Sequence, residues 1–305
     1  MLKEKLQFHK QQTRQQQKRS RSARLLSWVF LSPSFVGVLL FFILPFFVVI
    51  YYSTVNNPVQ HTFVGLDNYI RVFNNGAFKQ AAENTAGFSL IAVPLAVVLS
   101  LVLAVVMESR IPFKSKFRTF FLSPMMVPIA SVVLIWQVLF HFNGLVNEMT
   151  AIFGADKVDW MKSDKAAIVI VLLFLWKNLG YNMILFMASL SSVPVDLIEV
   201  ATMEGATPAQ VFFHIKLRYL SPTILFVTIM SLINSFKVFR EIYLMTGSYP
   251  YDSLYMLQHF MNNTFQSLDY QKLSAAAVIM CLVMIVIIGV LFVSEDRFGR
   301  DIEES

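Results

Sequence analysis

The sequence predicts an all-α integral membrane protein that crosses the bilayer six times. Of its 305 residues, 56% are hydrophobic and only 14% are charged, a composition too apolar for a soluble domain of this size. Six apolar stretches approach the ~20 residues that a helix needs to span hydrocarbon. They lie at 26–52, 85–107, 119–141, 166–190, 221–245 and 273–293. An even number of crossings puts both ends of the chain on one side.

The distribution of lysine and arginine predicts which side that is, because cytoplasmic flanks of membrane spans carry the excess of these residues. Sixteen lysines and arginines lie in the N-terminal tail, in the loops 108–118 and 191–220, and after the last span. Only six lie in the opposite loops, which are 53–84, 142–165 and 246–272. We therefore expect a multi-pass protein of the plasma membrane with both termini in the cytoplasm.

The domain organisation follows from these spans. We expect a basic cytoplasmic tail at 1–24, one membrane domain at 25–294 and a short cytoplasmic tail at 295–305. The basic residues cluster beside apolar spans, as orientation and anionic lipid head groups require, so we expect no nucleic-acid partner. The single cysteine, Cys281, lies inside the last span. A disulfide framework and a cysteine metal site are therefore excluded, and we expect no metal.

Proline interrupts the first three predicted spans, at Pro33, Pro45, Pro94, Pro124 and Pro128. A proline in a spanning helix frees a backbone carbonyl and bends the helix, which is tolerated where neighbouring helices or water restore the lost bond. Two interpretations stay open for each of them, a hinge for motion or a kink for packing.

The cytoplasmic loop at 191–222 has the local chemistry of two short helices joined by a sharp turn. Pro194 suits the first turn of a helix, and Asp196 and Glu199 lie near its start, where the helix dipole favours carboxylates. Gly205 can take the left-handed conformation that ends this helix. The loop could also be plain connecting structure.

A second helix start follows at once. Thr207 is placed to cap a helix, Pro208 suits its first turn, and Gln210 stands three residues after the cap. The loop is therefore predicted to be a helix-turn-helix on the cytoplasmic face.

This loop resembles the "EAA" loop of permease subunits from binding-protein-dependent ABC importers, most closely those of the maltose-type carbohydrate-uptake subfamily. The resemblance rests on Glu199, Val200, Ala201, Glu204, Gly205, Ala206, Phe212, Ile215, Leu217 and Pro222. Further stretches typical of the subfamily occur at 31–53, 65–73, 120–136 and 236–250. Two positions depart from the pattern: Val200 replaces an alanine, and Arg218 stands where a proline is usual.

The resemblance implies a type I ABC importer permease fold in which the loop docks on an ATPase. The coupling residues would be Glu199, Ala201, Glu204, Gly205 and Ala206. Glu199 would contact the ATPase, and Gly205 would set the angle between the two short helices. The implied partners are a homologous second permease, an ABC ATPase dimer, an extracellular solute-binding protein and a carbohydrate, with the lipid bilayer around the spans.

The sequence itself offers no enzyme site. It contains no G-x-x-x-x-G-K-[ST], so ATP and Mg²⁺ are expected on the separate ATPase and no cofactor on this chain. No H-E-x-x-H or G-x-S-x-G occurs either, and we expect no catalytic residues. The histidines, His259 among them, are scattered through tail and loop regions and are expected at the surface or the membrane interface.

The alternative from another class is a secondary transporter driven by an ion gradient. It is suggested by Lys177, Lys237, Arg240 and Glu241, which lie within or near spans, where charges are costly and often functional. Secondary transporters commonly show internal duplication, which this sequence lacks.

Two polar clusters in the fourth and fifth spans are candidates for handling a sugar. Amide, hydroxyl and aromatic groups bind carbohydrates, and the candidates are Asn178, Tyr181, Ser231, Asn234 and Ser235. The same groups could instead bond neighbouring helices. Lys177 and Lys237 could favour an anionic substrate, pair with carboxylates or reach toward an interface.

Overall fold

The computed structural model describes residues 28–57, 59–108 and 113–303, and side chains up to residue 296. The predicted tail 1–24 lies outside the described residues, as does Arg110. The side chains of the C-terminal tail from residue 297 onward lie outside them too.

Six helical segments of the described chain have the length and composition of membrane crossings, the third of them as a bent pair. Five of them are single segments: Trp28–Ser53, α4 (Gly76–Glu108), α8 (Ala166–Leu190), Ser221–Thr246 and α15 (Tyr270–Glu303). The bent crossing joins α5 (Lys114–Met126) to α6 (Ile129–Leu139) at an angle of 100°. The all-α fold with six predicted spans is confirmed, and α15 continues beyond the predicted end of the membrane domain at 294.

Shorter elements divide or connect these crossings. The first contains the π-helical turn η1 (Leu39–Ile43) and α2 (Leu44–Ser53); the fifth contains α12 (Ser221–Lys237) and α13 (Phe239–Thr246). The connecting helices are α3 (Asp67–Phe73), α7 (Leu145–Ile152), η2 (Trp160–Lys162), α9 (Val195–Met203), α10 (Pro208–Val211), η3 (Phe212–Lys216), α11 (Leu217–Tyr219), η4 (Asp252–Leu254) and α14 (Leu257–Gln266).

The prolines have different consequences in different spans. The π-helical turn η1 ends at Ile43, two residues before Pro45, the second residue of α2, which has no backbone N–H to donate to the preceding turn. Pro94 lies inside α4, which continues through it. Pro128 is the N-cap of α6, at the bend of the third crossing.

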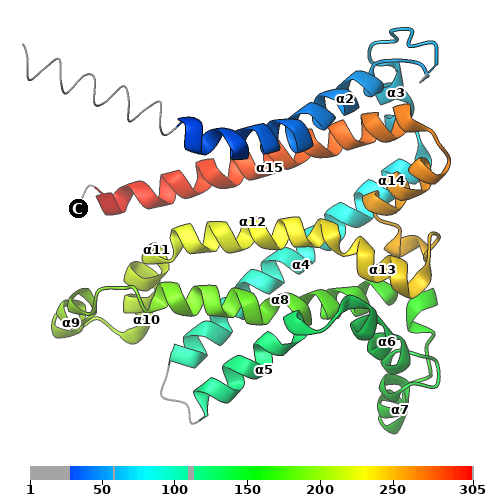
Figure 1. The fold of residues 1–305 in the computed structure, drawn as a ribbon. Coiled ribbons are helices and arrows are strands. Elements are labelled where there is room, and N and C mark those ends of the chain that lie inside the picture. Colours follow the sequence, from blue (N-terminus) through cyan, green and yellow to red (C-terminus); the bar gives the residue numbers. More distant parts are fainter. Residues whose placement is uncertain (1–27, 58, 109–112, 304–305) are drawn as a thin grey trace, which may run out of the picture.

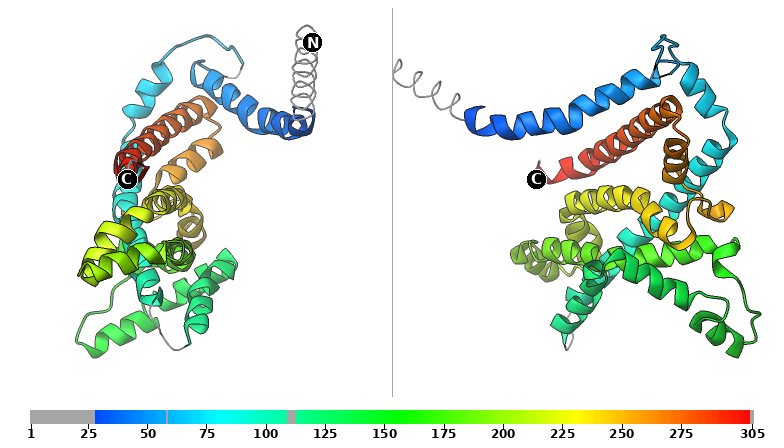
Figure 2. Two further views of the ribbon diagram at one scale, coloured as in Figure 1. Left: turned by 90° about the vertical axis from the view of Figure 1, so that its left-hand side faces the viewer. Right: turned by 45° about the vertical axis from the view of Figure 1, so that its right-hand side comes forward.

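The two ends of the molecule carry different connections. In Figure 1, α9, α10 and α11 lie at one end, on the left, together with the facing ends of α4 and α5. The helices α3, α6, α7, α13 and α14 lie at the opposite end. The loop 191–220 and the described ends of the loop 108–118, which the distribution of lysine and arginine placed on one side, therefore lie at the same end of the molecule. Figure 2 shows that the first crossing runs beside α15, apart from the group formed by α4, α8 and α12.

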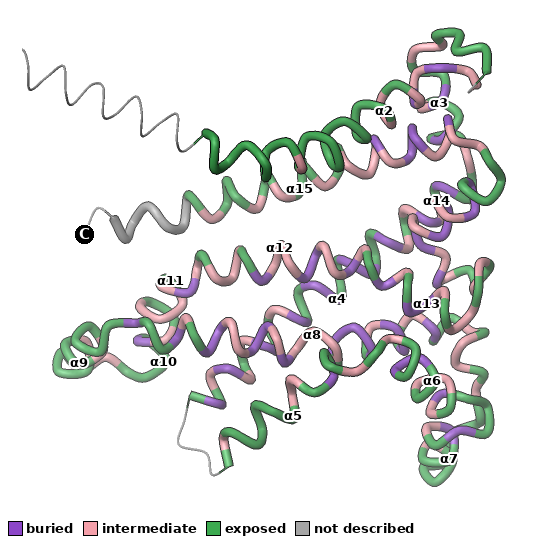
Figure 3. The backbone as a smooth tube through the Cα atoms, viewed as in Figure 1, coloured by how far each residue is buried: buried purple, intermediate pink, exposed green. Residues whose placement is uncertain are grey.

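The packed centre is the contact of α4 with α8 and α12. Small residues recur every four positions along α4, at Ala92, Ala96, Ser100 and Ala104, and all four are fully buried. Small side chains let helix backbones approach closely where lipid supplies no hydrophobic driving force. Figure 3 shows this burial along α4 and α8, whereas the first crossing is exposed along most of its length.

A second close approach joins α8 to the broken crossing. A Cβ added at Gly180 would lie 1.8 Å from the backbone oxygen of Phe121 in α5. Only glycine permits this contact, because a methyl group would displace the α5 backbone.

One expectation about the histidines is wrong. His259, at the start of α14, is fully buried, and its ring meets the edge of Phe239. Burial lowers the pKa of His259 to about 4. Its Nδ1 accepts a hydrogen bond from the Met256 backbone N–H, so the side chain belongs to the loop's core.

Candidate functional site

A cavity of about 400 Å³ opens between α8 and the α12–α13 crossing, at the bend of the third crossing. Its lining combines apolar, amide, phenolic and charged side chains. The lining residues are Met125, Val127, Ile129, Leu173, Phe174, Lys177, Asn178, Tyr181, Met230, Asn234, Lys237, Val238, Arg240 and Glu241.

The bend between α5 and α6 contributes one wall of this cavity. Val127 is extended and Pro128 caps α6, so the chain turns by 100° within a few residues. Non-helical backbone at membrane depth is tolerated where it is buried in protein or lines a water-filled cavity. Val127 and Ile129, on either side of Pro128, are among the lining residues. The broken helix therefore shapes the cavity.

Three of the five sugar-handling candidates meet in this cavity. The Nδ2 of Asn234 donates to the Oδ1 of Asn178 across the α8–α12 contact, at 3.0 Å. Asn178 in turn donates to the backbone carbonyl of Phe174, one turn earlier. Tyr181 follows Asn178 by three residues and lines the same cavity. Within the described part of the chain its hydroxyl has no hydrogen-bond partner.

The other two candidates lie elsewhere. Ser231 and Ser235 are buried, and neither is among the residues that line the cavity. Ser231 accepts a hydrogen bond from Asn182 of α8, and Ser235 bonds to Ser89 of α4. Both serine hydroxyls therefore join α12 to its neighbours. For these two residues the structure favours the alternative that the side chain bonds a neighbouring helix.

The charges that sequence placed within or near spans also gather here. Lys177 of α8 forms an ion pair with Glu241 of α13, whose side chain is only 8% exposed. Lys237 and Arg240 are exposed and line the same cavity. Neither of these two cations has a carboxylate within ion-pair distance among the described residues.

Sequence reasoning did not place Glu241, Arg240 or the backbone at Val127 in the site. Two signals could have found them. Opposite charges in consecutive apolar spans indicate a pair, because an isolated charge at that depth is costly. Two prolines four residues apart, Pro124 and Pro128, indicate a break in the third span.

The predicted coupling loop forms a helix-turn-helix. Pro194 is the N-cap of α9, which ends at Met203, and Gly205 follows with φ of +86°. This is the left-handed conformation that glycine adopts without strain. No other atom lies within 4 Å of a Cβ built at Gly205, so backbone conformation alone requires glycine here.

The second helix begins with the predicted capping box. The Thr207 hydroxyl accepts from the Gln210 backbone N–H, and the Gln210 side chain accepts from the Thr207 backbone N–H. Helical structure then continues through α10, η3 and α11 to Tyr219. Helix therefore extends through Arg218, the position that departs from the family pattern.

The loop presents an exposed, partly apolar surface. No residue of α9 is buried, and Val200 and Met203 are exposed. A shallow hollow of about 420 Å³ is lined by Ala201, Glu204, Gly205, Ala206, Gln210, Val211, His214 and Ile215. Glu199 is exposed beside it and has no ion-pair partner in the described part of the chain. Four of the five coupling candidates thus share one hollow, and the fifth lies on the adjoining helix.

An ion pair connects this loop to the membrane core. Lys216 Nζ lies 2.7 Å from Glu108 Oε1 at the end of α4. The Lys216 side chain is largely buried, with 18% exposure, so the loop is tied to the helix that forms the packed centre. Displacement of the loop would therefore pull on α4 as well as on α8 and α12.

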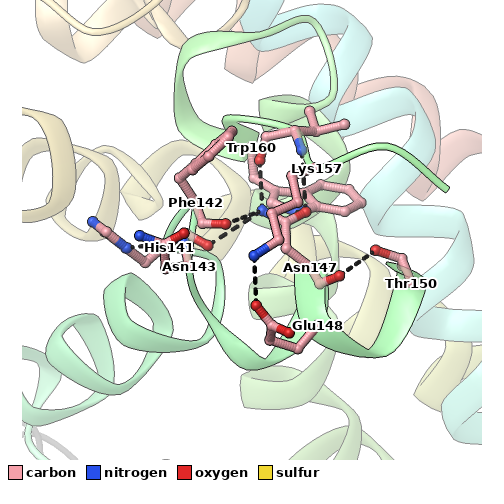
Figure 4. Close-up of polar contacts among 9 residues, drawn as sticks. His141, Phe142, Asn143, Asn147, Glu148, Thr150, Lys157 and Trp160 are labelled. Atoms are coloured by element: carbon pink, nitrogen blue, oxygen red, sulfur yellow. Dashed lines mark hydrogen bonds and ion pairs between the residues drawn. The ribbon is translucent and has the colours of Figure 1, made fainter. Parts of the chain in front are cut away.

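At the opposite end, Asn147 organises the loop around α7, as Figure 4 shows. Its buried amide donates to the carbonyl oxygens of Phe142 and Val158, and its Oδ1 accepts from the Trp160 indole. The Trp160 ring also packs edge-on against Phe140. Trp160 therefore takes part in the packing of this loop.

Comparison with known proteins identifies the family. The family described as binding-protein-dependent transport system inner membrane component matches residues 92–304. The chain is 29% identical over 241 residues to the trehalose/maltose transport system permease protein MalF of Thermococcus litoralis, covering 78% of this chain and 81% of that protein. It is 30% identical over 233 residues to the sn-glycerol-3-phosphate transport system permease protein UgpA of Escherichia coli, covering 75% and 79%.

The fold also matches a solved structure. A chain of a bacterial ABC transporter involved in the import of the acidic polysaccharide alginate superposes with a TM-score of 0.80 and 21% identity. The match covers 92% of this chain and 98% of that one. It establishes that the two chains share a fold.

These matches decide between the two classes of transporter considered from sequence. The matching family depends on a binding protein, so the ion-gradient alternative is set aside. Lys177 and Glu241, two of the charges that suggested it, form an ion pair with each other. The chain therefore belongs to the binding-protein-dependent transport system inner membrane components, the multi-pass permease subunits of ABC importers.

Proposed function

We propose that this permease carries a carbohydrate into the cell through the cavity between α8 and α12. The observation that carries the proposal is the meeting of Asn178, Asn234 and Tyr181 in one cavity, since amide and hydroxyl groups beside an aromatic ring suit a sugar. The names of two relatives, one for trehalose and maltose and one for sn-glycerol-3-phosphate, support a substrate rich in hydroxyl groups.

The energy is proposed to come from a separate ATPase dimer docked on α9 and α10, which binds ATP and Mg²⁺. The exposed Glu199, the hollow around Gly205 and the absence of a phosphate-binding loop from the sequence support this division of labour. A homologous second permease would complete the pathway, and an extracellular binding protein would deliver the sugar. Both chain termini would face the cytoplasm.

The pathway is tested by uptake in proteoliposomes that contain the whole complex, supplied with a panel of labelled sugars. Tyr181→Ala and Asn234→Ala should lower transport per assembled complex on the order of tenfold, because each removes hydrogen bonds to the sugar. Thr228→Ala is the control: it is also on α12, but its hydroxyl bonds only the Ile224 carbonyl. Unchanged transport per assembled complex in both cavity variants would reject the cavity as the pathway.

The coupling surface is tested by charge reversal. Losing one side of a desolvated ion pair costs ~2–5 kcal/mol, so Glu199→Lys should abolish binding-protein-stimulated ATPase activity and uptake together. Glu83→Lys makes the same reversal at an exposed position near the start of α4, at the end of the molecule opposite the loop, and should leave both intact. Wild-type stimulation in the Glu199→Lys complex would refute the docking role.

The orientation is tested with single cysteines in a Cys281→Ser background. Ser22→Cys reports the N-terminal tail, and Val59→Cys reports an exposed position in the opposite loop. An impermeant thiol reagent added to intact cells should label Val59→Cys and spare Ser22→Cys. The reverse pattern would contradict the proposed topology.

A further inference from the structure

The cavity carries an excess of positive charge. Three cations line it, Lys177, Lys237 and Arg240, against one carboxylate, Glu241. The Glu241 carboxylate is already bound by Lys177, which leaves Lys237 and Arg240 uncompensated among the described residues. Ionisable groups at membrane depth are costly and are retained where they face a water-filled pathway. Both side chains are exposed to the cavity and are free to bind an anion there.

Local helix structure accounts for neither cation. Lys237 and Arg240 lie on either side of Val238, where α12 passes into α13 with Val238 still in a helical conformation. No free helix end stands there whose dipole would favour or disfavour a cation. What the two cations share is the cavity that both line.

The neutral groups of the same cavity are arranged for a sugar ring. The Asn178–Asn234 bond uses one donor of Asn234 and leaves its carbonyl oxygen without a partner in the described chain. The Tyr181 hydroxyl also has no hydrogen-bond partner among the described residues. Guanidinium and ammonium groups bind carboxylate and phosphate, and the guanidinium does so through two parallel bonds. One cavity thus offers groups for sugar hydroxyls beside groups for an acid.

We propose that the transported carbohydrate is anionic, with its carboxylate or phosphate bound by Arg240 and Lys237 and its hydroxyl groups by Asn234 and Tyr181. This inference rests on the proposed function. It adds the substrate's charge, which the family alone does not specify. A carboxylated and a phosphorylated sugar share this chemistry, so the experiment separates them.

The test measures uptake by the complete reconstituted complex with its own binding protein. Labelled probes are a uronic-acid disaccharide, a hexose phosphate and a neutral disaccharide. Arg240→Gln and Lys237→Gln should each lower uptake of the transported anionic probe on the order of ten- to a hundredfold. Arg240→Lys should restore part of it, because it restores the charge. Lys162→Gln, which removes an exposed cation outside the cavity, should have no effect.

Each outcome bears on the proposal. Uptake of one acidic probe, lost in both glutamine variants at unchanged amounts of assembled complex, supports it and identifies the acid. Uptake of only the neutral probe overturns it and leaves the proposed function standing. A loss of assembled complex in proportion to uptake also overturns it, because the cations then bind a partner subunit. Failure to transport any of a wide panel of sugars would instead reject the proposed function.

Discussion

The helix-turn-helix loop at 191–222 and the cavity are built from contacts over very different distances in the chain. The capping box of the loop joins Thr207 and Gln210, three residues apart. The cavity depends on bonds between residues 56 apart, Asn178 and Asn234, and 64 apart, Lys177 and Glu241. The turn of the loop is therefore set by local contacts, with one ion pair tying the loop to α4, whereas the cavity exists only where α8, α12 and α13 lie side by side.

The loop is also less buried than the cavity. The first helix of the loop has no buried residue, whereas Glu241 and the serines beside the cavity are buried. A preformed, exposed loop suits docking, because little conformational entropy is lost on binding. A cavity built from distant segments suits coupling, because moving any one segment changes it. Four predictions, ordered by expected effect, test this contrast.

The largest effect is expected at Gly180, where α8 contacts the broken crossing that walls the cavity. In Gly180→Ala the new Cβ would lie 1.8 Å from the Phe121 oxygen, so α5 must move away. Overpacking costs ~1–3 kcal/mol where side chains can give way and occasionally more; here backbone atoms must move, so the loss should exceed that range and be at least as large as the loss expected at Lys177. Thermal unfolding in detergent should show a large drop in melting temperature. Gly87→Ala in α4 is the control, because no atom lies within 4 Å of the new Cβ, and its melting temperature should stay unchanged. Equal melting temperatures for the two variants would contradict the close contact at Gly180.

The next effect is expected at the Lys177–Glu241 pair. Removing one partner of a buried pair leaves an uncompensated charge at a cost of ~3–5 kcal/mol, so Lys177→Met should destabilise the cavity strongly. The double variant Lys177→Met/Glu241→Leu should recover most of the stability, because no lone charge remains. Additive losses in the double variant would show that the two residues act separately.

A control for this prediction lies in α7 and the segment that follows it, at the end of the molecule opposite α9. Lys157 and Glu148 form an ion pair at 2.6 Å, but their side chains are 35% and 59% exposed. Exposed pairs contribute ~0–1 kcal/mol, so Lys157→Met should change the melting temperature little.

A smaller effect on stability, with a clear effect on coupling, is expected at Gly205. A left-handed backbone costs a non-glycine residue ~1–2 kcal/mol, so Gly205→Ala should change the angle between α9 and α10. Gly154→Ala is a matched control, because Gly154 has φ of +78° and no atom within 4 Å, but follows α7 at the end of the molecule opposite α9 and α10. Binding-protein-stimulated ATPase activity should fall only in Gly205→Ala. An equal fall in both variants would refute the special role of the loop.

The smallest effect is expected at Thr207. Losing an N-cap costs ~1 kcal/mol, so Thr207→Ala should loosen the start of α10, while Thr207→Ser should keep the cap. Hydrogen exchange of the α10 amides should rise in the alanine variant alone. Because the capping bonds are local, exchange at α8 and α12 around the cavity should stay unchanged, and a change there would show that the cap supports more of the structure than the start of α10.

Much of this architecture was predictable from sequence because it depends on local chemistry. Long apolar runs predict crossings, since each backbone group must be bonded within its own helix in lipid. The capping box at Thr207 and the turn at Gly205 were likewise predicted, because their partners lie within a few residues. The break of the third crossing was indicated by Pro128, but its angle was not.

Which side chains face the cavity was decided only by the tertiary structure. Asn234 and Ser235 are neighbours in a continuous helix, yet Asn234 lines the cavity and Ser235 bonds to α4. Hydrophobicity places a helix in the membrane but does not determine its rotation about its own axis, which is set by packing against neighbours. The same holds for Lys177, whose partner 64 residues away could be identified only once α8 and α13 lay side by side. Sequence alone therefore determined the crossings and the coupling loop, and helix packing determined the cavity.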